Sequence, residues 1–293
     1  MERTVIHEEI RLRIDSPQTH LMDMAIEHLF SGTAYAKNVI GSVDELANVQ
    51  RAEVVDFYNQ HYVPNNMVLV VTGNVDSEAI FRQAEELYGK METKTLPDIE
   101  HITIPQLKGV VQLKEERPLQ QSYVFLGHPA PGANTHEAQA LTMAGIILGG
   151  GRSSRLYQRL VEEEQIVTSV SASYSGFSKI GIFGIVAELD PSKMERLTEI
   201  VQEELTRLQN EPVTEAELKR AQAMARSSLA FSTESSTNVA MYLGQMEIYG
   251  GIMGAVNRGA LLEQITAADI QRVAQNFLHP TAYIHSEISP VGR

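Results

Sequence analysis

Apolar residues recur at helical spacing through most of the first 91 residues of the chain. This period predicts helices over residues 2–13, after residues 15–17, over 48–62 and over 76–91. Ser42, followed three positions later by Glu45, adds a capping-box start. The pattern then changes at residues 67–75, MVLVVTGNV, which are β-branched and almost wholly apolar. Such a run predicts a strand that is buried on both faces.

The second part of the chain has the mixed pattern of an α+β domain. Residues 94–109 contain two prolines and no helical period, so they predict a linker. We therefore expect one domain over 1–95, a linker over 96–108 and a second domain over 109–293. In the second domain, strands are predicted near 110–114 and 121–127, over 165–177 and 179–189, and over 281–288. Helices are predicted over 135–148 and after Pro191 and Thr214.

The two parts share an internal repeat. Residues 45–69 align without gaps on residues 261–285, an offset of 216 positions, and Leu46 falls on Leu262 and Pro64 on Pro280. We interpret the match as a duplicated domain. At this offset the first copy lacks a counterpart of roughly residues 105–216, which include its strand pairs. The predicted fold is α+β: two homologous domains of helices packed on a mixed, largely antiparallel sheet, with the first domain truncated. We expect this first domain to pack irregularly or to borrow strands from a neighbour.

Composition and charge exclude several classes of function. Lys and Arg number 24 and Asp and Glu number 37, for a formal net charge of −13, which disfavours nucleic acid and anionic membranes as partners. No apolar run reaches the length of about 20 residues that spans a bilayer. The chain has no Cys, so a metal would need His, Asp or Glu. No secretory signal is visible, and cytoplasmic localisation is the default expectation.

The first predicted helix carries carboxylates that could serve a metal site. On a helical projection Glu9 lies on the same side as Val5, Ile6 and Leu12, and Glu2 is stacked almost above it. Buried carboxylates need a cation or must become protonated. Spacing alone favours an ordinary ion pair between Glu9 and Arg13 four residues later.

Four segments carry a resemblance to a known family. They are ERTVIHEEI at residues 2–10, FSGTAYAKNVIGSVDEL at 30–46, RAEVVDFYNQHYVPNNMVLVVTGNVD at 51–76 and LGGGRSSRLYQRLVEEE at 148–164. Together they make the chain resemble the pitrilysin/insulinase family of zinc metallopeptidases, which includes the mitochondrial processing peptidases. The resemblance implies zinc-dependent hydrolysis of peptide bonds in small or unfolded polypeptides. Glu9 would be the third zinc ligand and Glu2 a supporting acidic residue.

Two of the chain's departures from this family bear on its function. It contains no HxxEH motif, which in the family supplies two His ligands and the general base. We therefore expect zinc in the full-length protein, none at a catalytic site in this chain, and no activity from this chain alone. The Arg and Tyr that hold substrate in the opposing half of the family's chamber are replaced by Val161 and Thr168.

These departures leave two interpretations of function. The chain resembles the zinc-bearing half of a peptidase, which acts on a peptide substrate and needs a second peptidase-like subunit or a homodimer. The alternative is a noncatalytic partner or scaffold subunit that shares the fold and contributes a chamber wall.

Two other features are better explained by structure than by chemistry. Gly149-Gly150-Gly151 follows a predicted helix and lacks the Lys-Ser/Thr of a phosphate loop, so it predicts a helix end and a tight turn. One helical face carries four potential metal donors, and a solvated polar face is the favoured interpretation. These four residues are His20, Asp23, Glu27 and His28.

Overall fold

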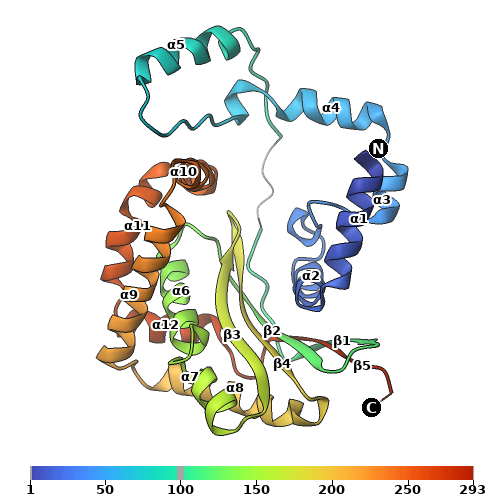
Figure 1. The fold of residues 1–293 in the computed structure, drawn as a ribbon, viewed down its shortest axis with the longest axis vertical. Helices are drawn as coiled ribbons and strands as arrows, with labels where there is room; N and C mark the ends of the chain where they lie inside the picture. Colours follow the sequence, from blue (N-terminus) through green and yellow to red (C-terminus); the bar gives the residue numbers. More distant parts are fainter. Residues whose placement is uncertain (1, 98–101, 293) are drawn as a thin grey trace. The chain divides into compact units, whose positions relative to one another are not determined.

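The computed structural model describes residues 2–97 and 102–292, and contacts divide the chain into two compact units (Figure 1). Unit 1 comprises residues 1–41, 102–227 and 259–293, and unit 2 comprises residues 42–101 and 228–258. The two units interleave along the sequence, so their limits differ from the boundary expected at residues 96–108. The assignment of two duplicated domains stays a prediction.

Unit 1 is built on a five-stranded sheet with the order β1-β5-β2-β4-β3. Its strands are β1 (Val111–Arg117), β2 (Ser122–Pro131), β3 (Val167–Gly176), β4 (Ile180–Leu189) and β5 (Ile284–Pro290). The β1 and β5 strands are parallel, whereas the β2–β4, β2–β5 and β3–β4 pairs are antiparallel. The predicted α+β class and its mixed, largely antiparallel sheet are confirmed.

One face of the sheet is covered by a layer of helices from the second half of the chain (Figure 1). The layer contains α6 (His136–Gly149), α7 (Arg155–Tyr157), α8 (Met194–Asn210), α12 (Ala267–Phe277) and the first part of α9 (Glu215–Ser232). The strand side chains beneath it include Leu126, Phe183 and Ile185, all buried. Successive residues of a strand point to opposite faces of the sheet. The positions that meet the helices are therefore every second residue of each strand.

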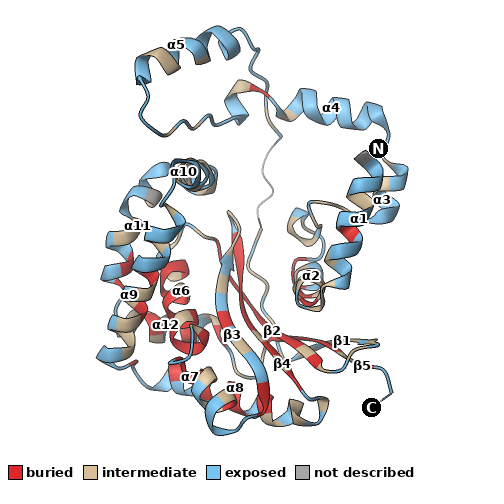
Figure 2. Cartoon of the chain, in the orientation of Figure 1, coloured by how far each residue is buried: buried red, intermediate tan, exposed pale blue. Residues whose placement is uncertain are grey.

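The opposite face of the sheet is covered by the N-terminal helices. Leu21 and Ala25 of α2 (Pro17–Leu29) pack with Phe125 and Ile182 of the sheet and with Ile284 of β5. The α1 helix (Glu2–Asp15) contacts α2, and the short η1 turn (Ala34–Ala36) follows. Since both faces of β2 are covered, nearly every residue of this strand is buried, as Figure 2 shows.

Unit 2 consists of helices and extended segments with few buried side chains. It contains α3 (Val43–Asn48), α4 (Arg51–His61), the η2 turn (Pro64–Asn66), α5 (Ser77–Tyr88), α10 (Ser236–Gly250) and the first part of α11 (Ile252–Gln264). Ser42 and Glu45 form the expected capping box of α3. The α4 and α12 helices begin and end 216 residues apart, and each starts with a capping box, which supports the predicted duplication.

The strand expected over residues 67–75 is wrong. The backbone there is extended at Met67, with φ −119° and ψ 144°, but the segment belongs to no strand ladder among the described residues. A strand needs a neighbour that accepts and donates its backbone hydrogen bonds, and no described strand lies beside this one. Val68, Leu69 and Val71 are consequently exposed.

No helix in residues 2–97 and 102–292 combines the length and apolar character that crossing a bilayer requires.

Candidate functional site

Glu9 lies on α1 with its side chain exposed, and not on a buried seam as expected. The buried residue of this helix is Ile10, whereas Val5 and Leu12 are exposed. The helix therefore turns the side centred on Ile10 toward its neighbours, about 100° away from Glu9. Because α1 carries apolar residues on two sides, the sequence did not show which side is buried. The packing of α1 against α2 determines that side.

The expected ion pair between Glu9 and Arg13 is also wrong. The Arg13 guanidinium donates from Nε and Nη2 to both carboxylate oxygens of Asp23 on α2, each at 2.6 Å. This bidentate pair holds the two helices together and raises the pKa of Arg13, chiefly through the hydrogen bond to Asp23. With Arg13 engaged, no ionic partner of the Glu9 carboxylate is seen within residues 2–97 and 102–292.

The other polar residues of the N-terminal helices form structural pairs. His20 Nε2 lies 2.8 Å from Glu115 Oε2 on β1, so His20 and Asp23 each contact an element other than their own. This agrees with the interpretation of a polar face and not with a metal cluster. Glu2 begins α1, but its side chain lies outside the described part of the structure.

The side chains described here do not by themselves fit a catalytic zinc ion. Such a site needs three protein ligands, and no group of three or more His, Asp or Glu that could hold a metal is found in residues 2–97 and 102–292. Glu9 can supply a single carboxylate. Any tightly held catalytic zinc would therefore need donors besides these.

Val161 and Thr168 lie at the positions that match the family's substrate-holding Arg and Tyr, and in this chain both make contacts within the fold. Val161 lies in η3 (Gln158–Glu163), a π-helical turn, and packs against the core beneath the helix layer. Thr168 is exposed near the start of β3, where its hydroxyl donates to Glu188 O at 3.1 Å. Gln165, between them, adopts a positive φ of 52°. Neither position 161 nor position 168 carries the cationic or phenolic side chain of the family's substrate-holding pair.

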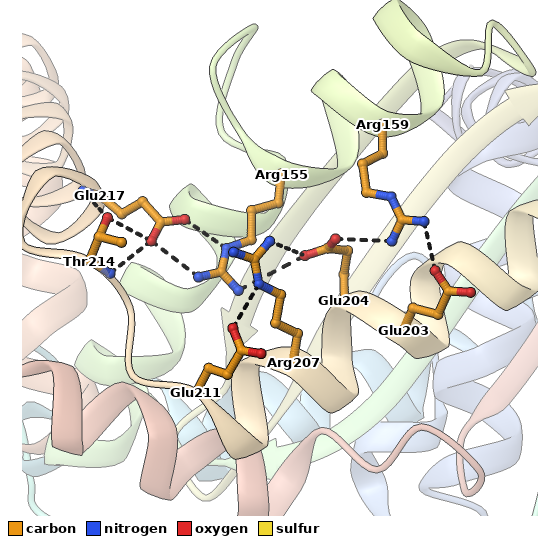
Figure 3. A network of polar contacts seen from close by, with 8 residues as sticks. All are labelled: Arg155, Arg159, Glu203, Glu204, Arg207, Glu211, Thr214 and Glu217. Carbon is orange, nitrogen blue, oxygen red and sulfur yellow. Dashed lines mark hydrogen bonds and ion pairs between the residues drawn. The ribbon is translucent and has the colours of Figure 1, made fainter.

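A polar cluster of unit 1 joins residues 155–159 to α8 and α9, as Figure 3 shows. Arg155 donates from Nε and Nη2 to the two carboxylate oxygens of Glu217, at 2.7 and 3.1 Å. Arg159 donates from Nη1 to Glu204 Oε1 at 3.0 Å. The other oxygen of Glu204 lies 3.9 Å from both Arg155 Nη1 and Arg207 Nη1. Because Arg155 and Glu204 are buried, the cluster locks three helical segments together.

Glu217 has a second task in this cluster, because it also caps the start of α9. Thr214 donates to it from both N and Oγ1, at 2.8 and 2.9 Å, and Glu217 N donates back to Thr214 Oγ1 at 3.2 Å. This confirms the expected capping box. Partial burial acts to raise the pKa of Glu217, but the hydrogen bonds from Arg155 and Thr214 outweigh it and lower the pKa to about 2.

Two buried histidines face the helix layer near the β5 side of the sheet. His128 of β2 is buried, neither ring nitrogen has a hydrogen-bond partner among the described residues, and its ring centroid lies 5.6 Å from that of Tyr283. Burial, with a smaller effect of His279, lowers the pKa of His128 to about 3. His285 Nε2 lies 3.8 Å from Glu287 Oε2, which in turn lies 3.1 Å from Lys114 Nζ. Sequence reasoning missed both histidines because strand alternation marks them only as inward-facing.

The sheet, its helix layer and the N-terminal helices that cover the other face form an α+β domain. A family profile described as "Peptidase M16 inactive domain" matches residues 48–225. The chain belongs to this family, which confirms the resemblance to zinc metallopeptidases.

Comparison with individual proteins agrees with this assignment. An uncharacterized zinc protease of Streptomyces coelicolor is 28% identical over 285 residues, which cover 95% of this chain and 62% of that protein. A protease from Helicobacter pylori is similar in fold, with a TM-score of 0.88, 23% identity and coverage of 99% of this chain and 71% of the solved one. A chain of complex III2 from Candida albicans is also similar, with a TM-score of 0.86, 19% identity and coverage of 98% and 70%. The chain spans 62–64% of the length of the first curated relatives it matches.

Proposed function

We propose that this chain is one part of a zinc-dependent endopeptidase that cleaves small or unfolded polypeptides. In this proposal Glu9 contributes one carboxylate to the metal, and the remaining donors come from polypeptide outside the described residues. Family membership and relatives named as zinc proteases support the reaction class. The role of Glu9 rests on its match to the family's third-ligand position, and Arg13, its nearest cation by helical spacing, is held by Asp23 and does not occupy the carboxylate.

The first test uses the chain as it stands. We expect metal analysis to find far less than one zinc per chain, and a quenched fluorescent peptide to stay intact, because one carboxylate cannot hold the ion. Stoichiometric zinc together with turnover by the purified chain would refute the proposal.

The second test addresses Glu9 directly. The chain is co-expressed with a polypeptide that supplies HxxEH but no third zinc-ligating Glu of its own, and zinc content and peptide cleavage are measured in the complex. Glu9→Gln should lower both by at least tenfold, because removal of one metal ligand opens the site. Glu8→Gln is the matched control, since Glu8 is exposed on the same helix and pairs with Arg11 at 3.0 Å. Equal effects of the two substitutions would remove Glu9 from the metal site.

The second candidate is a noncatalytic subunit of a peptidase-like assembly. It is favoured by the description of the matching family as an inactive domain and by the similar fold of a chain in the Candida albicans complex III2. Under this alternative the complex assembles equally well with either substitution, and neither changes its zinc content.

A further inference from the structure

The β5 strand carries two polar side chains, His285 and Glu287, on the face that meets the helix layer. They are only 4% and 6% exposed. At the predicted repeat offset of 216 these positions correspond to Leu69 and Val71, so the second copy has polar groups where the first has apolar ones. A buried polar group costs free energy unless a partner compensates it, so both side chains need partners.

The partners that the fold supplies to these two groups are incomplete. His285 Nε2 is buried and has no hydrogen-bond partner among the described residues. Burial lowers the pKa of His285, and the nearby charge of Glu287 does not outweigh it, so the ring is neutral near neutral pH. In the tautomer protonated at Nδ1, Nε2 is a hydrogen-bond acceptor. Glu287 Oε2 lies 3.1 Å from the Lys114 ammonium, but the geometry is not that of a hydrogen bond.

The two acceptors line a hollow of about 460 Å³ between α8 and the β1–β5 edge of the sheet. In the parallel β1–β5 pair, Gln112 lies opposite His285 and Lys114 lies opposite Glu287, so these four side chains share one face. The other polar residues of the lining are Glu195, Thr198, Glu199, Gln202 and Tyr283.

The charges around the hollow favour a cationic ligand. Its lining holds three carboxylates and one lysine. Glu199 is paired with Arg196 at 3.0 Å, which leaves Glu195 and Glu287 against Lys114. An anion would therefore meet a net negative charge, whereas a cation would be attracted.

A primary ammonium group matches the two acceptors. His285 Nε2 and Glu287 Oε2 are 3.8 Å apart, so one nitrogen can lie within about 2.9 Å of both and donate a hydrogen bond to each. Lys114 already brings such a group to Glu287, and its side chain is 62% exposed, so it can move into solvent when another ammonium enters. A metal ion is a poorer match, because no group of three or more His, Asp or Glu that could hold one is found in the part of the chain that the structure describes.

We propose that this hollow binds the primary ammonium group of an amine, which donates to His285 Nε2 and Glu287 Oε2 and displaces the ammonium of Lys114. The group can belong to a free amine or to the amino end of a peptide. The site requires neither zinc nor the proposed peptidase activity.

The test is a titration of the whole chain with diaminobutane up to about 10 mM, with EDTA present, at about pH 7.5, where the amine is charged. Long-range proton–nitrogen correlation spectra report the imidazole rings, and His285→Leu assigns the signal. We expect the His285 Nε2 signal to shift and saturate. Glu287→Gln should weaken binding at least about tenfold, because a charged acceptor is lost. Lys114→Met should tighten it by roughly threefold, because the competing ammonium is removed.

Glu116→Gln is the matched control, since Glu116 is exposed on the same strand as Lys114 and does not line the hollow. It should leave binding of the diamine unchanged. Each variant should also keep the far-UV circular dichroism of the wild type, which shows that the fold is intact.

Related compounds separate hydrogen bonding from charge and distinguish the two sources of the ammonium. The diamine with three methyl groups on each nitrogen keeps the charge but has no N–H donor, so it should not bind. A dipeptide amide with a free amino end that binds more tightly than diaminobutane, while its N-acetylated form does not bind, assigns the site to peptides. The reverse order of affinity assigns it to free amines. No saturable shift in the wild type or in Lys114→Met, equal losses in Glu287→Gln and Glu116→Gln, or equal binding of the methylated diamine would each overturn the proposal.

Discussion

The buried His128 should make unit 1 sensitive to moderate acid. Its pKa of about 3 lies well below the ordinary value of 6.5, because burial disfavours the imidazolium and His279 adds a small repulsion. In the unfolded chain the same ring binds a proton near pH 6.5. In the folded protein the buried His128 ring stays neutral until about pH 3. The contribution of His128 to the free energy of unfolding is therefore fully present above pH 6.5 and is lost progressively as the pH falls toward 3.

The magnitude follows from linkage. Each pH unit between these two pKa values removes about 1.4 kcal/mol from the free energy of unfolding. Between pH 6.5 and 4.5 the loss caused by this one residue amounts to about 2–3 kcal/mol. This loss is a large share of a typical free energy of unfolding of about 5–15 kcal/mol. This one side chain should therefore raise the pH at which acid unfolds the protein.

Substitution with an apolar residue isolates this effect. His128→Leu keeps the site filled and removes the proton-binding group, and neither ring nitrogen makes a hydrogen bond that would be lost. Urea unfolding at pH 7 and pH 4.5 gives the free-energy loss of each protein, and the variant should lose about 2–3 kcal/mol less than the wild type. His28→Leu on the exposed side of α2 is the control and should lose as much as the wild type.

An identical loss in the wild type and in His128→Leu would refute the reasoning. That result would mean that the folded protein protonates His128 near its ordinary pKa, with water entering the sheet–helix layer. Carboxylates also titrate in this range, but they contribute equally to both proteins and cancel in the difference.

Three further substitutions test other parts of unit 1 by urea unfolding at pH 7. Arg155→Met should lower the free energy of unfolding by about 3–5 kcal/mol, because it leaves Glu217 partly buried without its guanidinium, and adding Glu217→Gln should recover part of the loss. Gly149→Ala should cost about 1–3 kcal/mol, since a methyl group there would overlap the backbone of Ala172. Thr266→Ala should cost about 1 kcal/mol through loss of the α12 cap. A change below 0.5 kcal/mol would contradict the corresponding explanation.

Local signals in the sequence were enough for most of unit 1. The apolar run at residues 179–189, read as one arm of a hairpin, predicted β4, and Thr214 with Glu217 predicted the start of α9. The three glycines at 149–151 predicted the end of α6, where Gly150 N donates to Ile146 O at 2.9 Å and Gly151 has a φ of 81°. These features depend on residues a few positions apart, so one sequence contains the information that determines them.

Contacts between distant elements could not be predicted in the same way. Spacing offered Arg13 to Glu9, but Asp23 on the next helix accepts both of its hydrogen bonds. Glu217, the partner of Arg155, lies 62 positions away in the sequence. The residues that flank Arg155 do not indicate that its guanidinium is buried. A long charged side chain can pair with any opposite charge within its reach, and the tertiary fold determines which charges lie there.

The open segment at residues 67–71 shows the same limit for a whole strand. Its β-branched, uncharged pattern is typical of a strand, and an equivalent pattern is buried between β1 and β2 in β5, but residues 67–71 pair with no described strand. The pattern does not say which polypeptide supplies the neighbouring strands. We expect amide hydrogen exchange to leave residues 68–71 of this chain unprotected, because they pair with no described strand, and protection equal to that of β4 would contradict this reasoning.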